Sequence, residues 1–172
     1  YRYVLELYMH KETAVIQPIY QTSNYLIGED RKYSYSRSAN PTRDVLQDEL
    51  AKLENAKHGM AFATGLAAID AVMRLFGAGD EILCFPDLYG GSYRLFNTVH
   101  SDKTFTYGDG FEVTEKTRAI FIETPTNPTL QQLDIRLLSV LAKANNLLLI
   151  VDNTLASPYY QNPLDLGADI VV

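Results

Sequence analysis

Short apolar runs that alternate with helical patterns are the feature that most restricts the fold of this 172-residue chain. Apolar runs predict strands at residues 81–85, 104–107, 119–123 and 147–152, and another run begins at residue 169. Helical patterns cover residues 41–56, 67–76, 91–99 and 134–144. Short buried strands separated by helices are typical of a parallel sheet covered on both faces. The sequence therefore predicts an α/β fold with a mostly parallel sheet.

The N-terminal quarter of the chain differs from the rest. Residues 1–40 are rich in Tyr, Ser and Gln and show no sustained period, so we expect an extended arm. Asn40-Pro41 then combines a preferred N-cap residue with a proline suited to the first helical position. We expect a domain over residues 41–172 that begins with this helix.

Two places break the alternation of strands and helices. Ten residues separate Tyr107 from Arg118, whereas a crossover between neighbouring parallel strands needs about a dozen or more. Either these strands are not parallel neighbours, or residues are missing from the connection. The run at residues 169–172 stops before its strand would reach the carboxyl edge, where open α/β sheets place their ligands. We therefore expect a partial chain.

Composition and charge argue against several kinds of partner. A formal net charge of -6 provides no basic stripe for a nucleic acid backbone. Cys84 is the single cysteine, which rules out an intrachain disulfide and favours the cytoplasm. His10, His58 and His100 lack metal-ligand spacing, so we assign no metal site. Because no 18 apolar residues run together, we expect neither a signal peptide nor a membrane span.

Asp152 follows a buried aliphatic run and is therefore expected at the carboxyl edge of the sheet. There it could cap the next turn, bind a magnesium ion or pair with a protonated ring nitrogen. A magnesium–nucleotide site would need an upstream Gly-rich loop that ends in Lys-Ser or Lys-Thr, and the sequence has none. A cap and a partner for a ring cation remain open for Asp152.

Gly65 and Leu66 lie in the turn directly before the second predicted helix. Free backbone N–H groups at a helix start, together with the positive end of its dipole, attract an anion such as phosphate. The alternative is an ordinary tight turn before the helix. A cofactor with a ring nitrogen at one end and a phosphate at the other would use both this turn and Asp152.

Four further side chains are candidates for the same site. Tyr89 follows a strand and a proline, so its ring could stack on a planar cofactor or simply pack. Asn127, in a proline-rich loop after a strand, could bind a cofactor hydroxyl or make the turn. Tyr35 and Arg37 offer groups suited to a phosphate, although both could be ordinary surface residues.

Five segments carry a resemblance to a known family, and they occur in that family's order: YSRSANPTR (35–43), ATGLAA (63–68), YGGSYRLF (89–96), ETPTNP (123–128) and VDNT (151–154). Through them the chain resembles the Cys/Met metabolism family of pyridoxal-phosphate (PLP) enzymes. The resemblance spans residues 13–172. It implies the aspartate aminotransferase-like fold (fold type I), with residues 41–172 an incomplete cofactor-binding large domain and the C-terminal domain absent from this sequence.

The resemblance also implies a role for each candidate. Asp152 would pair with the pyridine nitrogen, and Tyr89, the candidate catalytic residue, would stack on the ring. Gly65 and Leu66 would give backbone N–H groups to the phosphate, and Asn127 would reach the ring hydroxyl. The residues that match Tyr35 and Arg37 bind the phosphate of the neighbouring subunit. These candidates are therefore Tyr35, Arg37, Gly65, Leu66, Tyr89, Asn127 and Asp152.

The family acts on small sulfur amino acids and homoserine esters, as homodimers that share active sites and usually pair into homotetramers. Gly91 resembles the cystathionine enzymes more than the methionine γ-lyases, so we favour cystathionine γ-lyase or γ-synthase chemistry, by β/γ-elimination or γ-replacement. Methionine γ-lyase, O-acetylhomoserine sulfhydrylase and an inactive cofactor-binding or assembly fragment are the alternatives.

One family feature is missing from this sequence. The family's Schiff-base lysine lies in a His-Ser-Ala-Thr-Lys type motif directly after the strand that matches residues 170–172. All seven lysines here, from Lys11 to Lys143, precede that point. We expect the full-length protein to be an enzyme and this fragment to be inactive by itself.

Overall fold

The computed structural model describes residues 15–26 and 32–172, and the chain divides into two compact units. The first unit comprises residues 1–50 and the second residues 51–172. Each unit is described by itself. Within the described ranges, no helix has the length and apolarity that a membrane crossing requires.

The first unit contains a short antiparallel contact and most of one helix. The backbone N–H of Tyr25 donates to the carbonyl of Ser34 (3.0 Å), and that of Ser36 donates to the carbonyl of Ser23 (2.9 Å). Helix α2 (Pro41–Leu53) begins where the sequence predicts. Its N-cap is formed by Asn40, whose Oδ1 accepts the backbone N–H of Thr42 at 2.8 Å.

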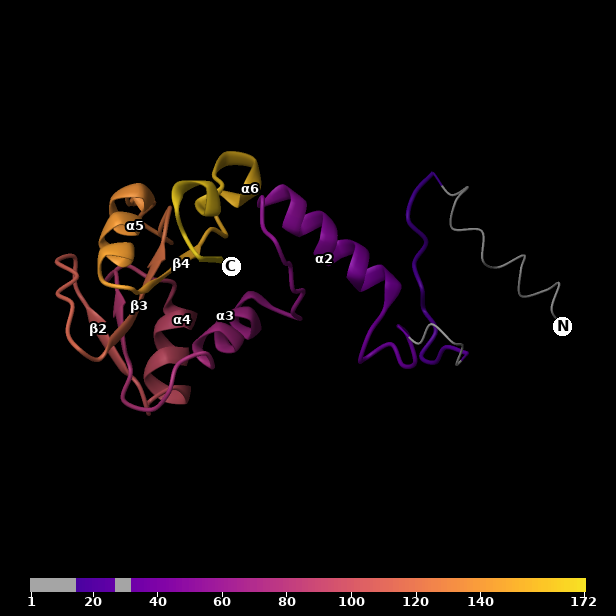
Figure 1. Cartoon of the computed structure of the whole chain (residues 1–172), viewed down its shortest axis with the longest axis horizontal. Helices are drawn as coiled ribbons and strands as arrows, with labels where there is room; N and C mark the ends of the chain where they lie inside the picture. The colour runs from indigo at the N-terminus through magenta and orange to yellow at the C-terminus, as the bar shows by residue number, and fades with distance from the viewer. Residues whose placement is uncertain (1–14, 27–31) are drawn as a thin grey trace, which may run out of the picture. The chain divides into compact units, whose positions relative to one another are not determined.

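The second unit is built on a five-stranded sheet in the order β2-β1-β3-β4-β5, and every pairing is parallel (Figure 1). The strands are β1 (Glu81–Cys84), β2 (Thr104–Tyr107), β3 (Thr117–Glu123), β4 (Leu148–Asp152) and β5 (Ile170–Val171). The predicted parallel sheet is confirmed, and each strand lies within two residues of its expected position at either end.

The helices of the second unit are α3 (Gly65–Met73), α4 (Gly90–Arg94), α5 (Ile135–Ala144) and α6 (Ser157–Tyr160), with a π-helical turn η2 (Leu95–Val99) and a 3-10 turn η3 (Pro163–Leu166). Helix α3 starts two residues earlier than predicted because Thr64 caps it, with its Oγ1 accepting the N–H of Ala67 at 3.1 Å. The sequence did not predict α6 and η3, because four residues are too few to show a helical period.

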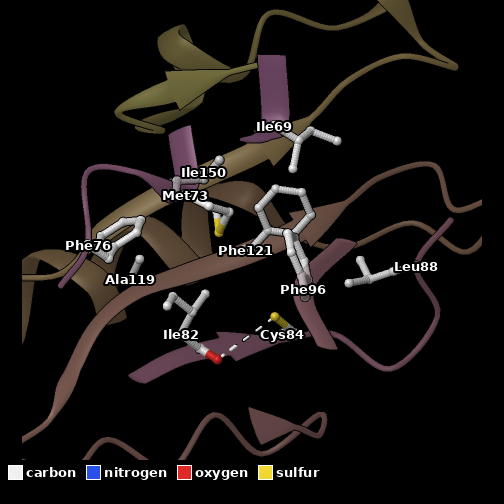
Figure 2. Packing of buried hydrophobic residues seen from close by; sticks show 10 residues of the cluster. All are labelled: Ile69, Met73, Phe76, Ile82, Cys84, Leu88, Phe96, Ala119, Phe121 and Ile150. Carbon is white, nitrogen blue, oxygen red and sulfur yellow. Dashed lines mark hydrogen bonds between the residues drawn. The ribbon is translucent and has the colours of Figure 1, made fainter. Parts of the chain in front are cut away.

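The core lies on both faces of the sheet, as predicted, and alternate strand residues face opposite sides. One cluster joins the strands to α3 and to η2, and it includes Met73, Ile82, Phe96, Phe121 and Ile150. Figure 2 shows Phe96 and Phe121 edge to face in this cluster, with ring centroids 5.1 Å apart. The other cluster joins the intervening strand residues to α5, on the opposite side of the sheet in Figure 1.

The short connection after Tyr107 has a clear explanation. Strand β1 lies between β2 and β3, so the two strands that this connection joins are not neighbours. The first of the two alternatives, that these strands are not parallel neighbours, therefore accounts for the short connection. Nine residues, 108–116, can span about 30 Å when extended, which is enough to pass β1 without a helix. Phe111 and Val113 pack on the α5 face and cover part of the sheet.

A buried carboxylate holds this connection by hydrogen bonds at the amino end of the sheet. Glu81 accepts the hydroxyl of Thr106 at 2.7 Å and those of Thr114 and Thr117 at 2.6 Å each. Although burial opposes ionisation, these hydroxyls hold the pKa of Glu81 below its ordinary value. The ionised side chain thus joins β1, β2, the connection and β3.

We predict that Glu81→Gln lowers the free energy of unfolding at pH 7 by about 1–3 kcal/mol, because hydrogen bonds to a charged acceptor are lost. Since the folded pKa is depressed, this stabilisation is present above the unfolded pKa and disappears as pH falls through the lower folded value. Urea unfolding at several pH values measures the difference. The exposed Glu115→Gln is the control, and a difference that stays constant from pH 7 to about pH 3 would contradict the prediction.

Candidate functional site

Two buried acids end neighbouring strands at the carboxyl edge of the sheet. Glu123 closes β3 and Asp152 closes β4, and the parallel register pairs them directly. They are 4% and 6% exposed, respectively. Carboxyl ends of parallel strands are where open α/β sheets bind their ligands. The two carboxylates therefore mark the centre of the candidate site.

Asp152 combines a structural contact with a free acceptor. Its Oδ1 accepts the backbone N–H of Thr154 at 3.1 Å and the Thr154 hydroxyl at 2.5 Å, so the capping role left open by the sequence is present. Within residues 15–26 and 32–172, both side-chain hydrogen bonds of Asp152 fall on this one oxygen. Oδ2 remains available for a donor such as a ring N–H.

Glu123 holds two loops by hydrogen bonds at the carboxyl edge of the sheet. Its Oε2 accepts the backbone N–H of Tyr89 at 2.6 Å, and its Oε1 accepts that of Asn127 at 2.9 Å. Burial raises the pKa of Glu123, and the negative charge of Asp152 acts in the same direction against the two N–H donors. The loops after β1 and β3 are thereby held beside Asp152.

Tyr89 immediately precedes α4 and its side chain is 43% exposed. The ring lies against the backbone of Gly91, where an added Cβ would overlap Cε1 and come within 3.0 Å of Cδ1. Glycine at position 91 therefore permits the ring orientation that the structure shows. An exposed aromatic face at the sheet edge fits the predicted stacking role.

Asn127 lies in the loop after β3, with its side chain exposed and its backbone held by Glu123. A second tie joins this loop to the one that carries Tyr89. Asp87 accepts the hydroxyl of Thr126 at 2.6 Å and also that of Thr129. In the described part of the chain the Asn127 side-chain amide has no hydrogen-bond partner, so it is free to bind a ligand hydroxyl.

The start of α3 offers an anion site on the same unit. The backbone N–H groups of Gly65 and Leu66 find no acceptor among the described residues, as expected for the first turn of a helix. A Cβ placed on Gly65 would meet no atom within 4 Å, so the space before the helix is open. Because residues 74–80 lead from the end of α3 to the amino end of β1, the start of α3 lies toward the carboxyl edge.

Tyr35 and Arg37 belong to the first unit. The guanidinium carbon of Arg37 lies 4.9 Å from the centroid of the Tyr35 ring, a cation–π contact that places the two side chains together. Both are exposed, as a contribution to a site on another subunit requires. Their part in the site remains a prediction.

The side chains on the second unit fit the cofactor that the sequence suggests. A free oxygen on a buried aspartate suits a pyridinium N–H, and unpaired N–H groups at a helix start suit a phosphate. An exposed tyrosine ring and a free amide complete the set. Among the residues that the structure describes, no three His, Cys, Asp or Glu side chains form a metal-binding group.

Sequence reasoning missed the residues that organise this edge. Glu123 follows an apolar run just as Asp152 does, so the same signal could have identified it. Asn153 and Gln161 are joined by two hydrogen bonds: Asn153 Nδ2 donates to the carbonyl of Gln161, and Gln161 Nε2 donates to Asn153 Oδ1, both at 2.9 Å. Gln161 Nε2 also donates to the carbonyl of Thr124 at 2.9 Å. No local sequence pattern predicts these hydrogen bonds, because the residues that form them come from separate loops.

The chain is similar to known proteins over most of its length. Residues 6–172 match the model of the family described as Cys/Met metabolism PLP-dependent enzyme. Cystathionine beta-lyase of Lactococcus lactis subsp. cremoris (strain MG1363) is 47% identical over 171 residues, which cover 92% of this chain and 45% of the relative. Cystathionine gamma-lyase of Bacillus subtilis is 47% identical over 174 residues, covering 94% and 46%. This chain thus spans about half the length of the curated relatives it matches.

Two solved structures show the same fold. Cystathionine gamma-lyase from Lactobacillus plantarum, complexed with L-serine, superposes with a TM-score of 0.85 at 47% identity, covering 90% of this chain and 43% of that one. CalE6, a methionine gamma lyase from Micromonospora echinospora, superposes with a TM-score of 0.88 at 32% identity, covering 94% and 47%. The predicted fold type is therefore confirmed.

We predict that Gly91→Ala displaces the ring of Tyr89, because the new Cβ overlaps it while Glu123 holds the Tyr89 backbone. NMR of the chain with ring-labelled tyrosine, with the Tyr89 signals assigned through Tyr89→Phe, measures the change. Gly90→Ala is the matched control, since its Cβ would meet just the flexible end of Arg94 at 3.3 Å. Unmoved Tyr89 signals in Gly91→Ala would refute the packing role of Gly91.

Proposed function

Because the chain belongs to the Cys/Met metabolism family of PLP-dependent enzymes, we propose that it forms the cofactor-binding part of a carbon–sulfur lyase or transferase. The observation that supports this most directly is the buried Asp152 with one oxygen free at the carboxyl edge of the sheet. The residues proposed to surround it offer the chemical groups that PLP needs, from the ring nitrogen to the phosphate.

Each candidate residue has a physical task in this proposal. Asp152 accepts a hydrogen bond from the ring N–H and keeps the ring nitrogen protonated. Tyr89 covers the ring, and Asn127 donates to its hydroxyl. The backbone N–H groups of Gly65 and Leu66 bind the phosphate, assisted by the dipole of α3.

The bound cofactor supplies an electron sink that stabilises negative charge at the substrate's α-carbon once its proton is removed. Asp152 makes that sink effective, because its negative charge favours the protonated ring nitrogen. Tyr89 shields one face of the site from water. None of the seven lysines of this sequence is assigned to the reaction, so we expect the 172 residues to bind the cofactor without turnover.

The proposed substrates are cystathionine and activated homoserine, with β/γ-elimination or γ-replacement as the reaction. Names of the similar proteins support this choice, since they include cystathionine beta-lyase, gamma-lyase and gamma-synthase. Gly91 adds weight to the cystathionine γ-lyase or γ-synthase type. We propose a cytoplasmic homotetramer built from dimers, in which Tyr35 and Arg37 reach the phosphate of the neighbouring subunit.

We predict that Asp152→Asn, made in the protein that contains these 172 residues, lowers turnover on the order of a hundredfold, the cost of losing one preorganised electrostatic contact. Product assays with cystathionine, methionine and O-acetylhomoserine measure the loss and identify the substrate. Glu115→Gln removes an exposed charge from the opposite end of the sheet and serves as the control. Full activity in Asp152→Asn, or a wild-type protein inert toward all three compounds, would contradict the proposal.

A further inference from the structure

Glu123 is a buried carboxylate whose partners are backbone N–H groups. Within residues 15–26 and 32–172 it forms no ion pair with Lys, Arg or His, although it is 4% exposed. Burying a charge is costly unless hydrogen bonds compensate. The compensation here comes from the two backbone N–H groups of Tyr89 and Asn127.

A carboxylate is particularly suited to this arrangement. Each of its two oxygens can accept an N–H group, and the bonds are charge-assisted. A glutamine in the same place would offer one accepting oxygen, and its NH₂ group would face the second N–H donor. The geometry therefore selects glutamate over a neutral side chain of the same size.

The two loops held by Glu123 are those that carry candidate cofactor contacts. Tyr89 presents the stacking ring and Asn127 presents the free amide, while the strand register sets Glu123 beside Asp152. We propose that Glu123 is a positioning residue of the cofactor site, which holds Tyr89 and Asn127 in register with Asp152. This inference rests on the proposed function, because it assumes that a pyridoxal-type ligand occupies the site.

The charge of Glu123 is opposed by its surroundings. Asp152 on β4 and Asp87 in the loop after β1 both add negative charge near it, and burial acts in the same direction. A ring cation bound by Asp152 would offset this repulsion and favour the ionised form of Glu123. Binding of such a ligand and ionisation of Glu123 are therefore coupled, with each favouring the other.

The test uses pyridoxine 5'-phosphate, which carries the ring nitrogen, hydroxyl and phosphate but has no aldehyde to react with lysine. We expect Glu123→Gln to bind this probe about tenfold or more weakly, the effect of losing one charge-assisted hydrogen bond. Glu123→Asp should recover part of the affinity. Glu81→Gln is the matched control, because it neutralises a buried glutamate at the opposite, amino edge and should leave the affinity of the folded chain unchanged.

A second readout needs no variant. In ¹⁵N-labelled wild-type chain, the amide signals of Tyr89 and Asn127 should shift together as Glu123 titrates, and the probe should lower their common midpoint. Separate midpoints, or one that the probe leaves unchanged, would overturn the positioning role even if Glu123→Gln failed to fold.

The outcomes separate this inference from the proposed function. If Glu123→Gln binds the probe as tightly as wild type while Asp152→Asn binds it weakly, the cofactor site stands and the positioning role is refuted. If the wild-type chain does not bind the probe, the proposed function fails and this inference fails with it.

Discussion

The parallel register of β3 and β4 is the constraint on which the site depends. It ends both strands on an acid at the same edge, so Glu123 and Asp152 are buried side by side. Like charges in such a place each need hydrogen-bond donors. Glu123 is satisfied by two loop N–H groups, and Asp152 by Thr154 on one of its oxygens. The positions of the loops and the free oxygen of Asp152 both follow from this arrangement.

The two ends of the sheet use buried glutamates for different purposes. At the amino end, Glu81 is surrounded by threonine hydroxyls and closes a short connection that has no helix of its own. At the carboxyl end, Glu123 takes backbone N–H groups and leaves the side chains of Tyr89 and Asn127 free. The buried glutamate at the amino end therefore stabilises the fold, whereas the one at the carboxyl end leaves side chains that can bind a ligand.

The sequence predicted the sheet and the main helices because their patterns are local: apolar runs for strands, helical periods for helices, and Asn40-Pro41 for the start of α2. It also placed Asp152 at the carboxyl edge, since that position follows from a strand that ends in an acid. It could not reveal that Glu123 binds the N–H groups of Tyr89 and Asn127, because those partners lie 34 and 4 residues away in separate loops. Strand order, which explains the short connection after β2, is likewise a non-local property.

The central claim is that Asp152 pairs with the ring nitrogen of a pyridoxal-type cofactor. The ¹⁵N chemical shift of ring-labelled pyridoxine 5'-phosphate, bound to the chain, reports directly whether that nitrogen carries a proton. The measurement is made at a pH above the ring nitrogen's own pKa, where the free compound has lost the proton. Pairing with Asp152 predicts that the bound nitrogen remains protonated in wild type and loses its proton in Asp152→Asn. A bound nitrogen that is deprotonated in both proteins, as in free solution, would contradict the claim.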